Sequence, residues 1–211
     1  MNRSKKHQHR MFQNPILELL SKSGPWMMNT FHLGLISFLL YFGYLQLDSP
    51  PLLSVIGVFV LAFLCWTLAE YLLHRYVFHF VREDNKLVKA FHYALHGYHH
   101  QKPYDANRLF MPPVPALLIL SIFFVIYYLF MGHFAWIFLA GFDLGYLCYA
   151  NVHYLVHTQK APAAFKGLWK HHALHHHKYP DKAFGVSSRI WDRIFGTMPP
   201  SHSSRSVEVR A

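Results

Sequence analysis

Cysteine and charged residues are both scarce in this sequence. The 211 residues include only two cysteines, Cys65 and Cys148, and both lie inside long apolar runs, where we expect them to pack as apolar side chains. Two isolated thiols exclude a disulfide framework, a thiolate zinc site and iron–sulfur chemistry. Charged residues make up only 14% of the chain, and 20 Lys and Arg outnumber 10 Asp and Glu. Such a composition is unusual for a soluble domain.

The sequence contains four long apolar runs, and hydrophobic residues make up 53% of the chain. A helix needs about 20 mostly apolar residues to cross the hydrocarbon core of a bilayer. The last two of the four runs are slightly short, and we expect helical continuation at their ends to extend them. The sequence therefore predicts an all-α integral membrane protein with four spans, at residues 26–47, 52–73, 114–131 and 134–151.

Lysine and arginine are absent from the two connectors at residues 48–51 and 132–133. All of them fall before residue 26, within 74–113 or after 157. Because basic loops stay in the cytoplasm, both termini and the loop around residues 74–113 are predicted to be cytoplasmic, in a bacterial inner membrane or an endoplasmic reticulum membrane. The net charge of +10 is then explained by orientation and by anionic lipid headgroups, and no nucleic-acid partner is expected.

The chain is predicted to form one membrane domain with two short flanking segments. Residues 1–25 form a basic tail with a short interfacial helix near 14–22, for which Asn14 is the N-cap and Pro15 the first helical residue. Residues 26–198 form the membrane domain, and residues 199–211 form a C-terminal tail. We expect neither a cleavable signal peptide nor a second domain.

Histidine, by contrast, is abundant, with 18 residues, ten of which gather in four clusters at the edges of the apolar runs. Imidazole is the commonest neutral nitrogen ligand for transition metals. Ten ligands provide about five for each of two metal ions, far more than one tetrahedral zinc requires. The predicted metal ligands are His74, His79, His96, His99, His100, His153, His157, His172, His175 and His176.

The spacing within these clusters supports a metal site. In the second and fourth clusters the histidines stand at i, i+3 and i+4, so they share one helical face and can converge on one centre. His153 and His157 stand at i and i+4, whereas His74 and His79 are five residues apart, so the first helix is expected to bend or end before His79. The alternative is that these are interfacial histidines that snorkel to water. Three helical-face spacings on one side of the membrane argue against it.

A nitrogen-rich site with two metals and open coordination positions suits oxygen activation by non-haem iron. Zinc also binds imidazole and can occupy such a site in a purified sample. Glu70, one helical turn before His74, either orients a ligand histidine through its second ring nitrogen or snorkels to the interface. Asp143, deeper in the fourth run, has the same two interpretations.

The four clusters, HRYVFH, HGYHH, HYLVH and HALHH, resemble the histidine boxes of the fatty acid hydroxylase/sterol desaturase superfamily. Residues 96–113 (HGYHHQKPYDANRLFMPP) and 184–197 (FGVSSRIWDRIFGT) are similar to stretches of the fatty acid (sphingolipid) 2-hydroxylases. The resemblance implies four membrane helices topped by a cytosolic helical cap, with the ten boxed histidines holding two iron ions. It also implies O₂-dependent hydroxylation of the carbon next to an acyl carboxyl or amide, in a free fatty acid or a ceramide.

The resemblance further implies an acyl substrate that enters from the bilayer and a separate electron donor, such as cytochrome b5, ferredoxin or a reductase. Candidate substrate contacts are Tyr98, Tyr149, Tyr154 and Trp191. One departure concerns the residues before the third box, where the family usually has Tyr-Asp and this chain has Tyr149-Ala150. Asn151 or Asp143 is the candidate replacement for that aspartate. With about 25 residues before the first span, we do not expect the N-terminal cytochrome b5 domain that eukaryotic relatives often carry.

Two other functions stay open at this point. One is hydroxylation or desaturation of a different lipid, such as a sterol or carotenoid, against which the RLFMPP and FGVSSRIWDRIFGT stretches argue. The other is a non-catalytic metal-binding or transport protein in the membrane. Transport would favour polar residues across the spans, whereas here the predicted ligands cluster on one side.

Overall fold

The computed structural model describes residues 10–200, and these residues form helices and loops without any strand. The four long helices are α2 (Pro25–Gln46), α3 (Leu52–Leu73), α6 (Pro113–Met131) and α7 (Phe134–Thr158). The short helices are α1 (Pro15–Leu20), α4 (Lys86–His92), α5 (Tyr98–Gln101), α8 (Lys166–His177) and α9 (Ile190–Ile194). Two π-helical segments, η1 (His74–Phe78) and η2 (Tyr93–Gly97), and two 3₁₀ turns, η3 (Ala106–Arg108) and η4 (Ala163–Phe165), complete the order.

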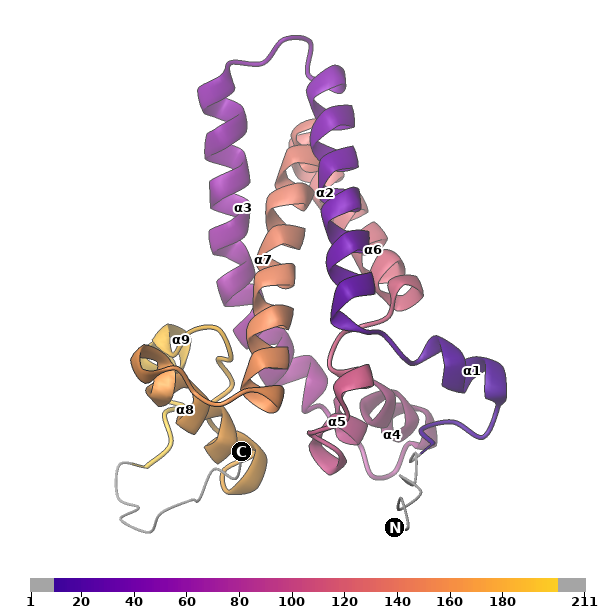
Figure 1. The fold of residues 1–211 in the computed structure, drawn as a ribbon. Helices are drawn as coiled ribbons and strands as arrows, with labels where there is room; N and C mark the ends of the chain where they lie inside the picture. Colours follow the sequence, from indigo (N-terminus) through magenta and orange to yellow (C-terminus); the bar gives the residue numbers. More distant parts are fainter. Residues whose placement is uncertain (1–9, 201–211) are drawn as a thin grey trace, which may run out of the picture.

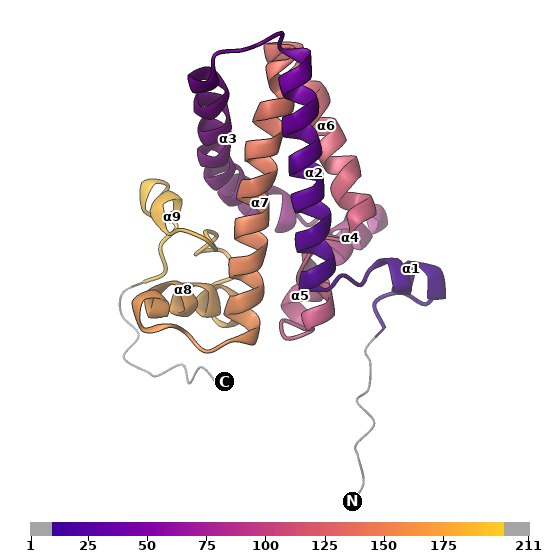
Figure 2. The same ribbon diagram turned by 45° about the horizontal axis from the view of Figure 1, so that its top comes forward.

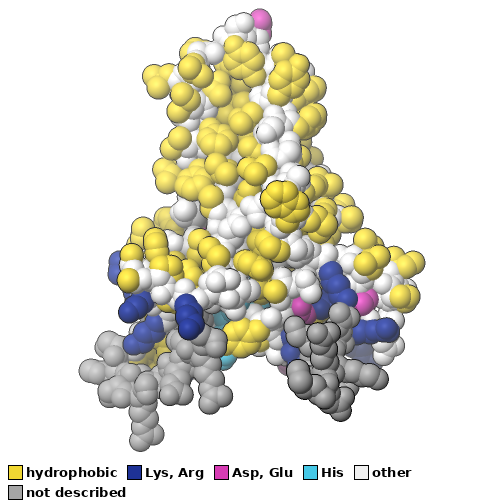
Figure 3. Space-filling model, in the orientation of Figure 1, with side chains coloured by type: hydrophobic (Ala, Val, Ile, Leu, Met, Phe, Trp, Pro, Cys, Tyr) yellow, Lys and Arg dark blue, Asp and Glu magenta, His cyan; other side chains and the backbone are white. Residues whose placement is uncertain are grey.

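The four long helices stand side by side and are long and apolar enough to cross a membrane (Figure 1). Many large hydrophobic side chains on these helices are exposed, and on the face shown in Figure 3 they cover the bundle, while lysine and arginine gather at the end where the short helices lie. An outward-facing apolar surface of this kind is stable in lipid and unfavourable in water. The predicted all-α membrane fold is therefore confirmed.

Helix α7 is the centre of the bundle, because it packs against α2, α3 and α6 and is the most buried of the four. Its close approach to α3 depends on Gly141 and Gly145, four residues apart. A Cβ on Gly141 would lie 2.2 Å from the backbone oxygen of Phe59, and one on Gly145 would lie 2.4 Å from Cβ of Trp66. This is the small-xxx-small packing typical of membrane helices, and any larger residue here would separate the two helices.

The short helices form a cap at one end of the bundle (Figures 1 and 2). Helices α8 and α9 lie on one side of the foot of α7, and α4 and α5 lie on the other, while α1 projects outward from the bundle. As predicted, α1 begins at Pro15, and the side chain of Asn14 accepts hydrogen bonds from the backbone N–H groups of Ile16 and Leu17. The helix exposes Ile16 and Leu19, as an interfacial helix does.

A buried polar pair joins two of the membrane helices. Nδ1 of His32 on α2 donates to the carboxylate of Asp143 on α7 at 2.8 Å, and both side chains are fully buried. Burial of either group alone would be costly, so the pair holds α2 and α7 in one register. Asp143 is therefore paired rather than snorkelling.

Candidate metal centre

The ten predicted histidines come together as two groups of five at the junction of the bundle and the cap. In each group the five nitrogen atoms that face inward lie within 4.8 Å of one another. The first group is His74, His79, His96, His100 and His175, and the second is His99, His153, His157, His172 and His176. The two groups adjoin, because the rings of His100 and His176 are stacked with centroids 4.3 Å apart.

The distribution of ligands between the groups does not follow from the spacing alone. The spacing allows each i, i+3, i+4 cluster to converge on one centre, but the structure divides each cluster between the two groups. In each cluster the i and i+4 histidines enter one group, while the i+3 histidine, His99 or His175, enters the other. Three residues rotate an α-helix by less than one turn and four by more, so the two side chains diverge to opposite sides of the shared face. Each of these helical segments thereby serves both centres.

Both π-helical segments carry ligands. Helix α3 continues directly into η1, which begins at His74 and ends just before His79. In the wider π turn, residues five apart lie close to one above the other, so His74 and His79 reach the same group. The predicted end of the helix before His79 is confirmed. The π winding, which brings the two rings together, could not be deduced from the spacing alone. Segment η2 also carries one ligand, His96.

The nitrogen atoms inside each group are placed to bind a cation. Neighbouring Nε2 atoms lie 2.8 to 3.1 Å apart, as in His74 with His96, His96 with His100 and His157 with His172. Nδ1 of His74 and of His175 each donate to a backbone carbonyl, which leaves a lone pair on Nε2 of a neutral ring. Five Nε2 lone pairs that face one another cannot all accept a hydrogen bond from a single proton. A metal ion between them would be coordinated by all five.

Burial also keeps these rings neutral, and neutral imidazole is the form that binds metal. Burial, with the nearby His175 and His92, lowers the pKa of His79 to about 3, and burial, with the nearby His79 and His153, lowers that of His100 to about 3. Burial lowers the pKa of His175 to about 4. The pKa values of His96, His99 and His172 fall well below 6.5 for the same reason. The residues present therefore fit two transition-metal ions.

The loop after α8 orients two ligands of the first group, His74 on η1 and His175 on α8. The carbonyl oxygen of Phe184 accepts a 2.5 Å hydrogen bond from His74, and that of Lys182 accepts a 2.7 Å bond from His175. The loop is in turn held by two buried carboxylates. Glu70 accepts from the backbone N–H groups of Val186 and Ser187, at 2.7 and 2.8 Å, and from the hydroxyl of Ser187.

Glu70 therefore does not touch a histidine, contrary to the first interpretation of its position, and it is not snorkelling either. It acts on His74 through the backbone of the loop. Asp192 on α9 is the second carboxylate, and it accepts from the backbone N–H groups of Phe184 and Gly185 at 2.9 and 2.8 Å. Asp192 also binds His171, which is buried and stands outside both histidine groups. The FGVSSRIWD stretch is thus a backbone support for the metal ligands.

A first cavity, of about 360 Å³, borders the histidines His96, His99 and His153. We call it the metal-side cavity. Met11, Leu17 and Leu20 of the segment around α1 also line it, so α1 covers part of the cavity. Arg108 fixes α1 there, because its guanidinium binds Glu18 and, at 2.5 Å, Asp105. Although burial opposes it, hydrogen bonds from the backbone of Phe12 and Met11, Lys22 and Arg108 lower the pKa of Glu18 to about 2.

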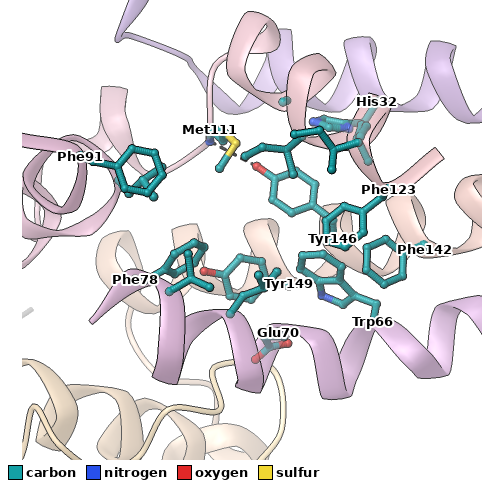
Figure 4. A pocket seen from close by; sticks show the side chains of 17 residues that line it. His32, Trp66, Glu70, Phe78, Phe91, Met111, Phe123, Phe142, Tyr146 and Tyr149 are labelled. Carbon is teal, nitrogen blue, oxygen red and sulfur yellow. Dashed lines mark hydrogen bonds between the residues drawn. The ribbon is translucent and has the colours of Figure 1, made fainter. Parts of the chain in front are cut away.

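A second cavity, of about 250 Å³, runs from the cap toward the middle of the bundle and is lined almost entirely by apolar side chains (Figure 4). We call it the membrane groove. It lies between α3 and α6, with α7 as its floor. Phe78 and Phe91 stand at its cap end, and Trp66 and Phe142 stand at the other (Figure 4). Both cavities are lined by Phe78, Leu95, Met111, Tyr146 and Tyr149, so they adjoin.

The four predicted substrate contacts occupy different places. Tyr149 lines both cavities and stacks on His153, with ring centroids 5.8 Å apart, and Tyr98 lines the metal-side cavity. Tyr154 packs on Phe110 and lines neither cavity. Trp191 also lies outside both, since its indole N–H donates to Thr67 on the far side of α3. Two residues that sequence reasoning missed, Tyr146 and Met111, line both cavities.

Neither candidate replacement for the usual aspartate is available at position 150. Ala150 is buried against Met28 and Phe110. Asn151 exchanges hydrogen bonds with Asn29 at 2.9 and 3.0 Å, and Asp143 is occupied by His32. Ala150 lines the metal-side cavity, so the position stays within reach of a ligand.

The substitution Ala150→Asp is expected to lower thermal stability and turnover rather than improve positioning. It would place a carboxylate in an apolar cluster without a partner and would overpack the site, which costs about 1–3 kcal/mol for the volume alone. Differential scanning fluorimetry and product analysis measure both effects. The matched variant Ala150→Leu separates overpacking from charge. Higher turnover in Ala150→Asp than in the wild type would contradict this account.

The sequence and structure have clear relatives. Residues 59–197 match the family described as "Fatty acid hydroxylase". The chain is 37% identical over 157 residues to rat fatty acid 2-hydroxylase, covering 72% of this chain and 42% of that protein. It is 34% identical over 192 residues to the Arabidopsis thaliana dihydroceramide fatty acyl 2-hydroxylase FAH2, covering 90% and 80%. The chain thus spans about two fifths of the length of the rat relative.

A solved structure has the same fold. The protein titled "Full length scs7p (only hydroxylase domain visible)" superposes with a TM-score of 0.82 at 33% identity, and the match covers 90% of this chain and 71% of that one. Since the family match spans residues 59–197 and includes all ten clustered histidines, the chain belongs to the fatty acid hydroxylase family.

Proposed function

We propose that this protein hydroxylates the carbon next to the carboxyl or amide group of a lipid acyl chain, in a free fatty acid or a ceramide, using a di-iron centre and O₂. The observation that carries the proposal is that the membrane groove adjoins the metal-side cavity, which borders histidines of both groups. The relatives named for acyl 2-hydroxylation support the position of attack. When bound, two iron ions would supply the O₂ activation that an unreactive C–H bond requires.

The protein's own contribution is to bind and orient the chain. The groove takes an acyl tail because its walls are apolar, while the metal-side cavity carries the polar groups that a head group needs. With the tail in the groove, the head lies between the histidines and the cover formed by α1. The carbons nearest the head are therefore the ones closest to both histidine groups. The rings of Tyr149 and Tyr146 line both cavities, at the place where these adjoin.

Hydroxylation consumes two electrons and two protons beyond those of the C–H bond, so a separate reductant is required. We propose an acidic redox protein, such as a cytochrome b5, a ferredoxin or a reductase, that docks on the basic cap. Lysine and arginine gather at this end of the molecule (Figure 3). The same charges support our proposal that the cap, and with it the metal centre, faces the cytoplasm, in a bacterial inner membrane or an endoplasmic reticulum membrane.

The experiment that tests the function uses the full chain in lipid vesicles, loaded with iron and given a chemical reductant and ¹⁸O₂. Released acids are analysed by mass spectrometry. We expect one ¹⁸O atom at carbon 2, and none from a sample loaded with zinc. Label only at mid-chain carbons, or only on added sterols or carotenoids, would overturn 2-hydroxylation in favour of another lipid oxidation. Unlabelled lipids from an iron-loaded sample would favour a non-catalytic metal protein.

The sidedness has its own test. Reporter fusions placed after Ser49 and after Gly132 are expected to report the side opposite the cytoplasm, because both connectors lack lysine and arginine. A fusion after Gln159, in the cap, is the matched control and is expected to report the cytoplasm. Cytoplasmic signals from either of the first two fusions would refute the orientation.

A further inference from the structure

The deep end of the membrane groove is closed by aromatic side chains from three helices. On each of α3, α6 and α7, the lining residue farthest from the cap is aromatic: Trp66, Phe123 and Phe142. Phe142 joins the other two, with ring centroids 5.0 Å from Trp66 and 5.1 Å from Phe123. Figure 4 shows these three rings together at one end of the groove. We define them as the aromatic stop.

The packing behind the stop is continuous. Tyr127, one turn beyond Phe123, lies 5.6 Å from Phe142 and 4.6 Å from Phe138, measured between ring centroids. Ala62 and Trp66 of α3 belong to the same buried cluster as these rings. Helices α3 and α6 are therefore joined across α7 just beyond the groove, whereas nearer the cap the groove lies between them. An acyl chain that follows the groove meets packed rings at this depth.

The distance from the metal ligands to the stop fixes a length. Trp66 precedes His74 by eight residues on α3, and Phe142 precedes His153 by eleven residues on α7, which are about 12 and 16 Å at 1.5 Å per helical residue. A fully extended chain advances roughly 1.2 Å per bond, so about 10 to 13 bonds fit between the ligands and the stop.

We propose that the aromatic stop limits the substrate, so that acyl chains of about 12 to 16 carbons bind fully extended and longer chains are disfavoured. This inference rests on the proposed function in one respect, that carbon 2 lies at the histidine groups. A longer tail must turn sideways and leave the groove between α3 and α6. Ile122 on the groove wall is 61% exposed, so that route leads into the surrounding lipid and forfeits the groove's contacts.

Two substitutions move the length limit in opposite directions. Phe123→Ala removes one ring of the stop and deepens the groove. Ile119→Phe adds a ring about one helical turn nearer the cap and shortens it, because Ile119 also lines the groove. Phe124→Ala is the matched control. Phe124 is the next residue of α6 and is half-buried like Phe123, but it packs on Trp136 with ring centroids 4.4 Å apart, away from the groove.

The test presents an equimolar mixture of saturated fatty acids of even length, from 12 to 24 carbons, to the full chain in vesicles. Native mass spectrometry measures the bound acids, with and without iron, and product analysis measures the 2-hydroxy acids. In the wild type we expect the 14-carbon acid to be bound over the 24-carbon acid. Phe123→Ala should raise the ratio of 20-carbon to 14-carbon acid by about tenfold, since a few methylenes in a hydrophobic pocket discriminate at that level.

Ile119→Phe should lower the same ratio, and Phe124→Ala should leave it unchanged. If Phe123→Ala, Ile119→Phe and the wild type share one length distribution, or if the wild type binds 24 carbons as well as 14, the inference is wrong. The two proposals fail separately. If the variants change the chain length of the bound acids but no 2-hydroxy acid forms, the aromatic stop is supported and the proposed function is refuted. If 2-hydroxy acids form with the same chain lengths in the wild type and in both variants, the proposed function is supported and the aromatic stop is refuted.

Discussion

His172→Ala is expected to remove at least one of two bound metal ions and to lower hydroxylation by more than about 100-fold. The reason is that outer partners of metal ligands already cost about 10- to 100-fold when they are replaced, and His172 is itself predicted to be a ligand. Its Nε2 lies 2.8 Å from that of His157 and 3.1 Å from that of His176. Elemental analysis of the purified protein and product formation under O₂ measure the two effects.

His177→Ala is the matched control, because His177 is on the same helix and is exposed. It stands outside both histidine groups, so both metal ions and full activity should remain. His7, His9 and His202 lie outside the described residues. Retention of two metal ions and activity in His172→Ala would refute the assignment of the second group.

Glu70→Ala is expected to lower metal affinity and activity by about 10- to 100-fold, although Glu70 touches no histidine. The substitution frees the backbone N–H groups of Val186 and Ser187, and through them the carbonyl of Phe184 that orients His74. Glu70→Gln should restore part of the loss, because the remaining amide oxygen still accepts from the two N–H groups. Metal titration and product analysis measure the effect.

A second readout separates positioning from general unfolding. In the metal-free protein, Glu70→Ala should raise amide hydrogen exchange at residues 184–187 while exchange in α7 stays slow. Asp181→Asn is the control, since Asp181 is an exposed carboxylate in the same loop. Unchanged exchange at 184–187, together with wild-type metal affinity, would show that Glu70 does not support the ligand loop.

The spans and the ligand set could be predicted from the sequence because both follow from local patterns. Apolar runs of sufficient length define membrane helices, and histidine spacing identifies shared helical faces. Helix α7 shows the limit of this reasoning. The apolar run ends at residue 151, and the expected helical continuation extends to Thr158, which carries His153 and His157 into the cap. Hydropathy does not predict how far a helix extends beyond its apolar run, because the polar cap around that part of the helix is formed by other segments of the protein.

The features that were missed depend on contacts between distant segments. The division of each cluster between two centres depends on what faces the helix from both sides, and the π winding of η1 reduces the rotation between His74 and His79 in a way that spacing does not reveal. Glu70 and Asp192 both support the loop, and the hydrogen bond between Glu70 and Val186 joins residues more than 100 positions apart in the sequence. Gly141 and Gly145, by contrast, form a GxxxG pattern that was visible in the sequence and overlooked.

The most direct test of the metal centre is anomalous diffraction from crystals of the iron-loaded protein, measured at the iron edge. We expect two anomalous peaks in each chain, one surrounded by Nε2 atoms of His74, His79, His96, His100 and His175 and the other by those of His99, His153, His157, His172 and His176. A single peak, or two peaks with His99 and His175 exchanged between the groups, would contradict this expectation.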